Sequence, residues 1–245
     1  MAENEDIVIE DDLVETDVPL DEEDLPVPVP KLSWKPKTRI GRLIADGVIT
    51  DIDTLIDSGL PIIEAEIVDL LLPELKNDLL LVGQSKGKFG GGQRRIFRQT
   101  QKKTKEGNKP HFGTAAVVGD ENGHVGIGFG KSKETVPARE KAVRNAKKNI
   151  IKVRRGSGSW ESNTTELHSI PYKVTGKAGS VHVTLFPAPK GTGLKIQGDC
   201  AKVLAMAGIK DVWSQTRGST KSTINLIQAC FNALKSLSEV KGGAQ

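Results

Sequence analysis

The chain has few of the features that mark secreted, membrane-spanning or disulfide-stapled proteins. Its 245 residues contain no run of about 18 apolar residues, and the acidic start lacks the basic and apolar segments of a secretory signal. Its two cysteines, Cys200 and Cys230, are too few for a disulfide framework. The sequence therefore predicts a soluble cytoplasmic protein with two buried free thiols and no membrane association.

Motifs for catalysis, metal binding and nucleotide binding are incomplete. Gly130-Lys131-Ser132 resembles the end of a phosphate-binding loop, but Val125 stands where that motif requires glycine. The four histidines have neither cysteine nor carboxylate neighbours at metal-ligand spacing, and the serines in 157–159 and 218–220 have no nearby base. We therefore expect no enzyme activity, no catalytic residue, no metal site and no cofactor.

Aromatic side chains are scarce as well. With six Phe, three Trp and one Tyr, the chain has little material for the stacking platforms of single-strand binders. This composition favours recognition of folded RNA by shape and by contacts to phosphates.

What the chain has in excess is unevenly distributed charge. Residues 1–30 hold twelve Asp and Glu and no Lys or Arg, so the remaining residues carry 35 basic against 19 acidic side chains, a net charge of +16. Residues 84–110 alone hold nine basic residues and the single acidic Glu106. A surplus concentrated in this way indicates a polyanionic partner.

The first third of the chain divides into an arm and a helical segment. The acidic, proline-containing residues 1–33 cannot bury enough apolar surface to fold, so we expect a disordered arm. Residues 34–78 predict three short helices at 40–45, 53–57 and 63–72, separated by Asp46-Gly47 and Ser58-Gly59. Ile63 and Ile67 are expected on the buried side of the third helix, and Glu64, Glu66 and Asp69 on a solvated side.

Residues 93–152 predict three strands and a helix. Residues 93–105 are extended and basic, and residues 112–119 and 124–129 form a hairpin around a turn at 120–123. Gly126, Gly128 and Gly130 alternate, so another backbone or RNA can approach one face closely. A helix follows, with Thr135 as its cap; Val143, Ala146 and Ile150 are expected to pack on the sheet, and Lys141, Arg144, Lys148 and Lys152 to form a basic stripe.

The last part of the chain predicts a linker at 154–165 and then β-β-α-β-α. The strands are expected at 169–175, 180–186 and 209–216, and the helices from about 199 to 207 and after a cap at Ser219 or Thr220. In the second strand Val181, Val183 and Leu185 share one face.

Several blocks of this sequence resemble the ribosomal protein five family of the small subunit. They are residues 113–138, 141–149, 187–194 and 207–212, in the family's order and spacing. The basic segment 34–42 and an insertion near 158–161 resemble the archaeal and eukaryotic branch, and the modest length resembles that of archaeal members.

The resemblance implies an α+β fold in two domains. Residues 79–153 would form a domain similar to the double-stranded-RNA-binding fold, β-β-β-α, and residues 166–245 a two-layer α/β sandwich. It also implies a structural constituent of the small ribosomal subunit in the cytoplasm, which binds ribosomal RNA, contributes to assembly and supports translational accuracy. Its implied neighbours are the small-subunit proteins of families four and eight, the decoding centre and the messenger RNA entry path.

Basic residues in the loop, the strands and the helix are the expected RNA contacts. They are Lys86, Lys88, Arg94, Arg95, Arg98, Lys102, Lys103, Lys131, Lys133, Arg144, Lys148, Lys152, Arg154 and Arg155. The resemblance further implies a protein interface at two glycine-containing loops, with Gly176, Lys177, Gly179, Lys190, Gly191 and Gly193.

Two other functions remain open at this point. A free RNA-binding module, such as a chaperone, would have the same charge pattern but would sediment away from ribosomal subunits. An RNA-stimulated NTPase would hydrolyse nucleotide in a direct assay, and Val125 argues against it.

Overall fold

The computed structural model describes residues 34–85, 92–158 and 165–238. Pro36–Gln245 forms one compact unit, distinct from Met1–Lys35. The predictions for the acidic arm, for Lys86 and Lys88 and for part of the linker lie outside the described residues.

Three short helices precede the first sheet, as predicted. They are α1 (Arg39–Ala45), α2 (Ile52–Asp57) and α3 (Glu66–Leu71). Gly47 and Gly59 follow the first two with φ of +73° and +70°, a conformation that glycine adopts without steric cost. The third helix was wrongly placed at its start: it begins at Glu66, Ile63 is exposed, and Ile67 with Val68 forms the buried side.

The first sheet contains the three predicted strands and two more. Its strands are β1 (Lys76–Leu80), β2 (Arg98–Thr104), β3 (Gly107–Gly119), β4 (His124–Ser132) and β5 (Ile150–Lys152). All pairings are antiparallel, in the order β1-β3-β4-β5, and β2 also pairs with β3. Strand β1 follows the helical segment and joins it directly to the sheet. The predicted domain boundaries stay a prediction.

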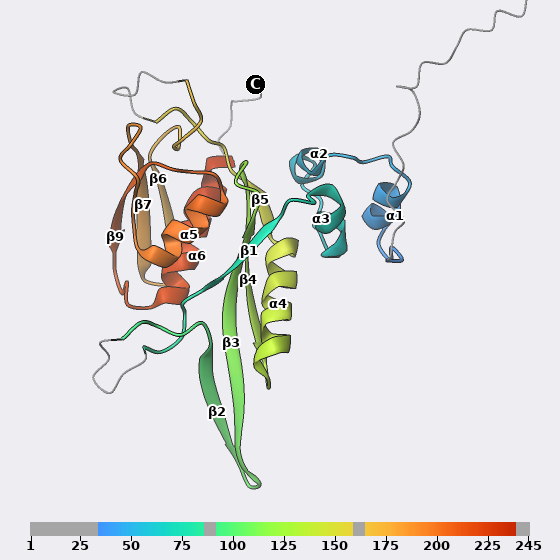
Figure 1. Cartoon of the computed structure of the whole chain (residues 1–245), viewed down its shortest axis with the longest axis vertical. Coiled ribbons are helices and arrows are strands. Elements are labelled where there is room, and N and C mark those ends of the chain that lie inside the picture. Colours follow the sequence, from blue (N-terminus) through green and yellow to red (C-terminus); the bar gives the residue numbers. More distant parts are fainter. Residues whose placement is uncertain (1–33, 86–91, 159–164, 239–245) are drawn as a thin grey trace, which may run out of the picture. The chain divides into compact units, whose positions relative to one another are not determined.

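The row of glycines in β4 receives a helix. In α4 (Thr135–Lys148) the buried residues are Ala138, Ala142 and Ala146. A Cβ on Gly128 would lie 2.1 Å from the Ala146 nitrogen, so only glycine allows this approach (Figure 1). The close neighbour expected at these glycines is therefore a backbone of the chain itself.

Three predictions about this helix were wrong. The N-cap position is Glu134, and Thr135 is already helical. Val143 is only half-buried, and Ile150 and Lys152 lie in β5, because the helix ends at Lys148. The alanine face fits the glycine row more closely than larger side chains could, which explains why it is the face that packs.

The second sheet is covered by helices on one face. It contains β6 (Val174–Ala178), β7 (Val181–Pro187), β8 (Leu194–Lys195) and β9 (Val212–Arg217), with α5 (Gly198–Met206) and α6 (Thr223–Ser238) packed against it (Figure 1). The strand order is β6-β7-β9-β8. The alternation predicted for β7 is confirmed, since Val181, Val183 and Leu185 are buried.

This sheet also differs from the prediction in detail. The first strand begins at Val174 instead of residue 169, and the short β8 pairs in parallel with β9, which adds a strand. The last helix begins at Thr223, so neither Ser219 nor Thr220 caps it.

The two sheets share one hydrophobic core. Val117 and Val125 of the first sheet belong to the same buried cluster as Val203 and Leu204 of α5. The buried Asp199 carboxylate accepts a hydrogen bond of 2.9 Å from the Leu81 backbone N–H across this junction. The end of β3 near Val117 is therefore packed into a core that both sheets share.

The two cysteines lie inside this core as free thiols, as predicted. A hydrogen bond to Cys200 and complete burial raise the pKa of the Cys230 thiol well above its ordinary value. Both residues act as small apolar core side chains.

Candidate nucleic-acid interface

Strand β2 and the first half of β3 form a two-stranded ribbon, which we call the basic ribbon (residues 98–113). Strand β4 pairs with β3 only from Phe112 onward, so the outer part of the basic ribbon has no third strand. In Figure 1 it extends beyond the end of α4. All of β2 except its last residue is exposed. A ribbon of this kind presents two faces to a partner.

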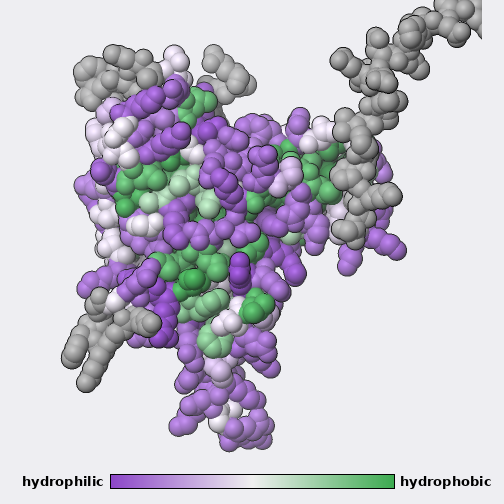
Figure 2. Space-filling model, viewed as in Figure 1, coloured by the Kyte–Doolittle hydropathy of each residue, from purple (hydrophilic) through white to green (hydrophobic). Residues whose placement is uncertain are grey.

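The positive charges of the basic ribbon are only partly compensated. Residues 98–109 contain five Lys and Arg and one acidic residue, Glu106, whose carboxylate lies 2.8 Å from the Lys109 amine. That pair is exposed and contributes at most about 1 kcal/mol. Lys102 stands directly opposite Lys109 in the register, an arrangement that destabilises the isolated ribbon. The visible surface of the ribbon is almost wholly hydrophilic (Figure 2).

Two adjoining hollows lie where the basic ribbon meets the rest of the unit. The first, about 650 Å³, brings Arg94 and Arg98 together with Lys221. The second, about 330 Å³, is lined by Arg98, Lys131 and the partly exposed ring of Phe129. The structure thus gathers predicted residues from the loop, β2 and β4 around one concave surface.

Lys221 is a member of this surface that the sequence analysis missed. It lies just before α6, a 16-residue helix whose N-terminal N–H groups carry partial positive charge. The only sequence signal was a lysine directly before a helix start. Its proximity to Arg94 and Arg98 depends on tertiary packing between distant parts of the chain.

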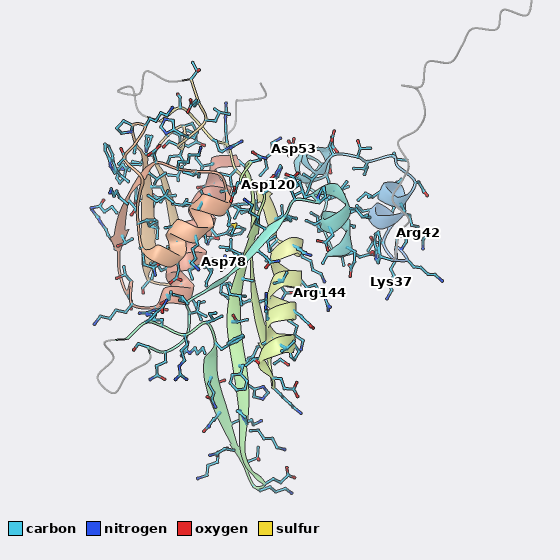
Figure 3. The ribbon with its side chains drawn as sticks, in the orientation of Figure 1. Lys37, Arg42, Asp53, Asp78, Asp120 and Arg144 are labelled. Atoms are coloured by element: carbon cyan, nitrogen blue, oxygen red, sulfur yellow. The ribbon has the colours of Figure 1, made fainter. Side chains whose placement is uncertain are left out.

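The outer side of α4 carries a second group of basic residues. Lys133 is exposed just before the helix, and Lys148 is half-buried in its last turn. Arg144 borders a hollow of about 390 Å³ between α3 and α4, beside Glu66 and Asp69 (Figure 3). The Lys147 amine lies 2.5 Å from the Asp69 carboxylate. This side of the helix therefore mixes open and internally matched charges.

Two of the predicted RNA contacts, Lys152 and Arg155, are engaged within the chain. The Lys152 amine lies 2.8 Å from Asp53 and 3.5 Å from Asp57 of α2, and its hydrogen bond to Asp53 raises its pKa. The Arg155 guanidinium donates to the carbonyl oxygens of Glu121 and Asn122, at 3.3 and 2.9 Å. Lys152 thus fixes the helical segment and Arg155 fixes the β3–β4 turn. Arg154, between them, is exposed.

The same helical segment is held by a cluster that we call the His124 clasp: His124, Asp120 and Asp53. Asp53 and Asp120 are labelled in Figure 3. The two ring nitrogens of His124 lie 2.5 Å from Asp120 Oδ2 and 2.7 Å from Asp53 Oδ1. The hydrogen bond to Asp120 raises the pKa of His124 despite partial burial, and Asp53 adds to the effect. Burial alone would raise the pKa of both carboxylates, but their hydrogen bonds, to Lys152 and His124 for Asp53 and to His124 for Asp120, lower it.

The residues expected at a protein interface fall into two groups. The first was expected in a loop, but Gly176 and Lys177 lie in β6, and Gly176 is buried where a Cβ would sit 2.1 Å from the Ala229 oxygen of α6. Gly176 therefore serves packing, because α6 needs that close approach. Lys177 and Gly179 are exposed, the latter in the β6–β7 turn with φ of +59°.

The second group lies in the predicted loop before β8. The Lys190 amine pairs with Glu166 at 2.7 Å, and both side chains are largely exposed. Gly191 and Gly193 have φ of +91° and +73°. The Gly193 N–H donates to the buried Asp211 carboxylate at 2.7 Å, which fixes the end of the loop.

Two further findings concern chemistry. Within residues 34–85, 92–158 and 165–238, no three His, Cys, Asp or Glu side chains gather as a metal ion would require. Among the helices of this described part, none has the length and apolar character needed to cross a membrane.

Similar proteins extend over most of the chain. The family models for ribosomal protein S5 match its N-terminal domain at residues 96–154 and its C-terminal domain at residues 176–245. "Small ribosomal subunit protein uS5" of Nanoarchaeum equitans is 49% identical over 208 residues, covering 85% of this chain and 89% of the relative. The uS5 proteins of Methanocaldococcus jannaschii and Staphylothermus marinus are each 50% identical, covering 83% of this chain and 87% and 88% of the relatives. The chain therefore belongs to the ribosomal protein S5 (uS5) family, non-enzymatic structural constituents of the small subunit of the cytoplasmic ribosome.

Proposed function

We propose that this chain binds ribosomal RNA of the small subunit chiefly through the basic ribbon and the concave surface at its base. The observation that carries the proposal is the excess positive charge of the basic ribbon, where five basic residues stand against the single acidic Glu106 and Lys102 faces Lys109 across exposed strands. Phosphates placed between such lysines would replace their repulsion with attraction and release counterions.

The proposed contacts are most, but not all, of the residues predicted from the sequence. In the described part they are Arg94, Arg95, Arg98, Lys102, Lys103, Lys131, Lys133, Arg144, Lys148 and Arg154, with Lys221 added. Lys86 and Lys88 remain predictions outside the described residues. Lys152 and Arg155 are left out because their side chains are engaged within the chain.

We further propose that the loops at Gly179 and at 187–193 contact neighbouring small-subunit proteins of families four and eight, and so support translational accuracy. The second loop suits this role because its end is held by Asp211 while Lys190 remains exposed. Its shape is then fixed before a partner arrives, which lowers the entropy lost on binding. The decoding centre and the messenger RNA entry path are proposed to lie nearby.

The test replaces Arg94, Arg95 and Arg98 together by Ala and measures occupancy in purified small subunits by quantitative mass spectrometry. We expect lower occupancy, because three exposed guanidinium groups are removed from the base of the basic ribbon. The control replaces Lys210 and Lys235, which are exposed outside the proposed interface. Wild-type occupancy of the triple variant, or an equal loss in the control, would contradict the proposal. A large pool that sediments apart from subunits would favour a function off the ribosome.

A further inference from the structure

The second sheet has an open face that the proposed function does not use. Helices α5 and α6 cover the side on which Val174, Val183 and Leu185 are buried. On the other side the strand residues alternate into solvent. Thr175, Gln215 and Arg217 are exposed there, and Thr184 is half-exposed. No described helix packs on this side in Figure 1.

The open face carries positive charge and no acidic residue. Lys177 of β6, His182 of β7 and Arg217 of β9 are register partners and so form one row across three strands. Strands β6, β7 and β9 contain no Asp or Glu. A hollow of about 330 Å³ includes His182 and Arg217 of this row but not Lys177, and its lining residues are Lys173, Thr175, His182, Thr184, Gln215 and Arg217.

Aromatic rings lie at the other end of the same face. Phe186 pairs with Trp213 in the register, and the indole-bearing residue is 42% exposed. The Lys173 amine is held 5.0 Å from the centre of the Phe186 ring. Four residues along β7 separate the aromatic row from the charged row, a distance of about 13 Å. The exposed Trp213 ring offers a π-face on which a nucleobase can stack, beside the positive charges of the same face.

We propose that this open face binds a short single-stranded RNA segment, with a base stacked on Trp213 and phosphates held by Lys177 and Arg217. The inference rests on the proposed function in taking RNA as the ligand, but it uses none of the residues of the basic ribbon. A base offers a π-face to the indole, and its backbone offers anions at the spacing of a few nucleotides. An acidic peptide could pair with the positive charges, but its carboxylates would not stack on the Trp213 ring. A duplex would keep its bases stacked away from the sheet.

The test measures binding of the full chain to a fluorescent eight-nucleotide single-stranded RNA and to an RNA hairpin by anisotropy. Trp213→Ala is expected to weaken single-strand binding about tenfold, whereas Trp213→Phe keeps a ring and should remain within about twofold of wild type. Log affinity falls with log salt, and replacing Lys177 and Arg217 by Ala should reduce the magnitude of that slope by about 1.4, at about 0.7 per phosphate. Neither change should weaken hairpin binding more than about twofold, because the basic ribbon is proposed to bind the hairpin.

The matched control is Lys102→Ala with Lys103→Ala on the basic ribbon, which should weaken hairpin binding and spare single-strand binding. If Trp213→Ala and Trp213→Phe have the same affinity for the single strand, the ring does not stack on a base and the face is not a single-strand site. The same conclusion follows if polyglutamate binds and its affinity depends equally on Lys177 and Arg217. If the control fails to affect the hairpin while the Trp213 result holds, the proposed function of the ribbon fails and this inference stands. Melting curves of each variant identify losses caused by unfolding.

Discussion

Basic residues have different surroundings in two regions of this protein. Around the helical segment, Lys147, Lys152 and His124 each face a carboxylate of α2 or α3, at 2.5 to 2.8 Å. Along the basic ribbon, Lys102 faces Lys109 instead, and the one ion pair there joins Lys109 to the exposed Glu106. Both regions contain several basic residues, but carboxylates are close to them mainly in the helical segment. A surface for an anionic ligand is therefore marked by the positive charges that have no carboxylate of the chain beside them.

The largest effect is expected when the basic ribbon is reversed in charge. Lys102→Glu with Lys103→Glu should weaken binding to small-subunit RNA by about 100-fold at moderate salt, because two contacts become repulsive. Folding stability should stay equal or rise slightly, since Glu at 102 would attract Lys109. Filter binding and urea unfolding measure the two quantities. A loss of both stability and affinity would mean that the ribbon charges serve the fold.

The next largest effect is expected around the helical segment, where basic residues pair with carboxylates. Asp53→Asn removes the carboxylate shared by His124 and Lys152, and should cost about 1 kcal/mol of unfolding free energy once solvent screening is included. RNA affinity should not fall. Asp51→Asn is the control, because Asp51 is exposed and makes no side-chain cap hydrogen bond. Weaker RNA binding by the Asp53 variant would erase the distinction between the two regions.

A change of pH should have a smaller effect on the free energy of unfolding, because it alters the charge of the His124 clasp without removing any of its side chains. The folded pKa of His124 is raised, so its stabilisation is complete below the unfolded value of about 6.5 and is lost as pH rises through the folded pKa. The pKa values of Asp53 and Asp120 are lowered, so their contribution is present above about 3.9 and is lost as pH falls through their folded values.

Unfolding free energy should therefore decline from pH 6 to pH 9 in the wild type. The variant His124→Gln should decline less over the same range, because it has no proton to lose there. Urea titrations at several pH values measure the difference. Parallel pH profiles for the two proteins would show that the clasp is not coupled to folding.

The smallest effect is expected at a surface pair. Lys147→Ala breaks the ion pair with Asp69, which is 49% exposed, and should cost less than about 1 kcal/mol. Its RNA affinity should match the wild type, whereas Lys148→Ala, the adjacent position, should bind RNA more weakly. Calorimetric melting and filter binding test both. An equal loss of RNA affinity in the two variants would mean that an ion pair within the chain does not keep a lysine from contacting RNA.

Strong periodic patterns made much of the fold predictable. The β3–β4 hairpin, α4 and the alternation in β7 follow from residue patterns within each segment. Strands β1, β5 and β8 were missed because each has five residues or fewer and exists only through pairing with a distant strand. The row of β4 glycines predicted a close neighbour but could not say which one.

The candidate site was predictable as a composition and less so as a surface. The basic ribbon was predictable from the sequence because its basic residues lie within one short stretch of the chain. The engagement of Lys152 depends on Asp53 and Asp57, far away in the chain, and the position of Lys221 beside Arg98 likewise joins distant segments. Such relationships arise only from tertiary packing, which no local pattern encodes.

The salt dependence of binding to a small-subunit RNA duplex fragment separates lysines that contact phosphates from lysines that pair within the chain. For Lys102→Ala with Lys103→Ala, the magnitude of the negative slope of log affinity against log salt should decrease by about 1.8, at about 0.9 for each phosphate that is no longer neutralised. For Lys147→Ala with Lys152→Ala, whose amines are matched by carboxylates, the slope should not change. Equal changes in the two variants would contradict the account.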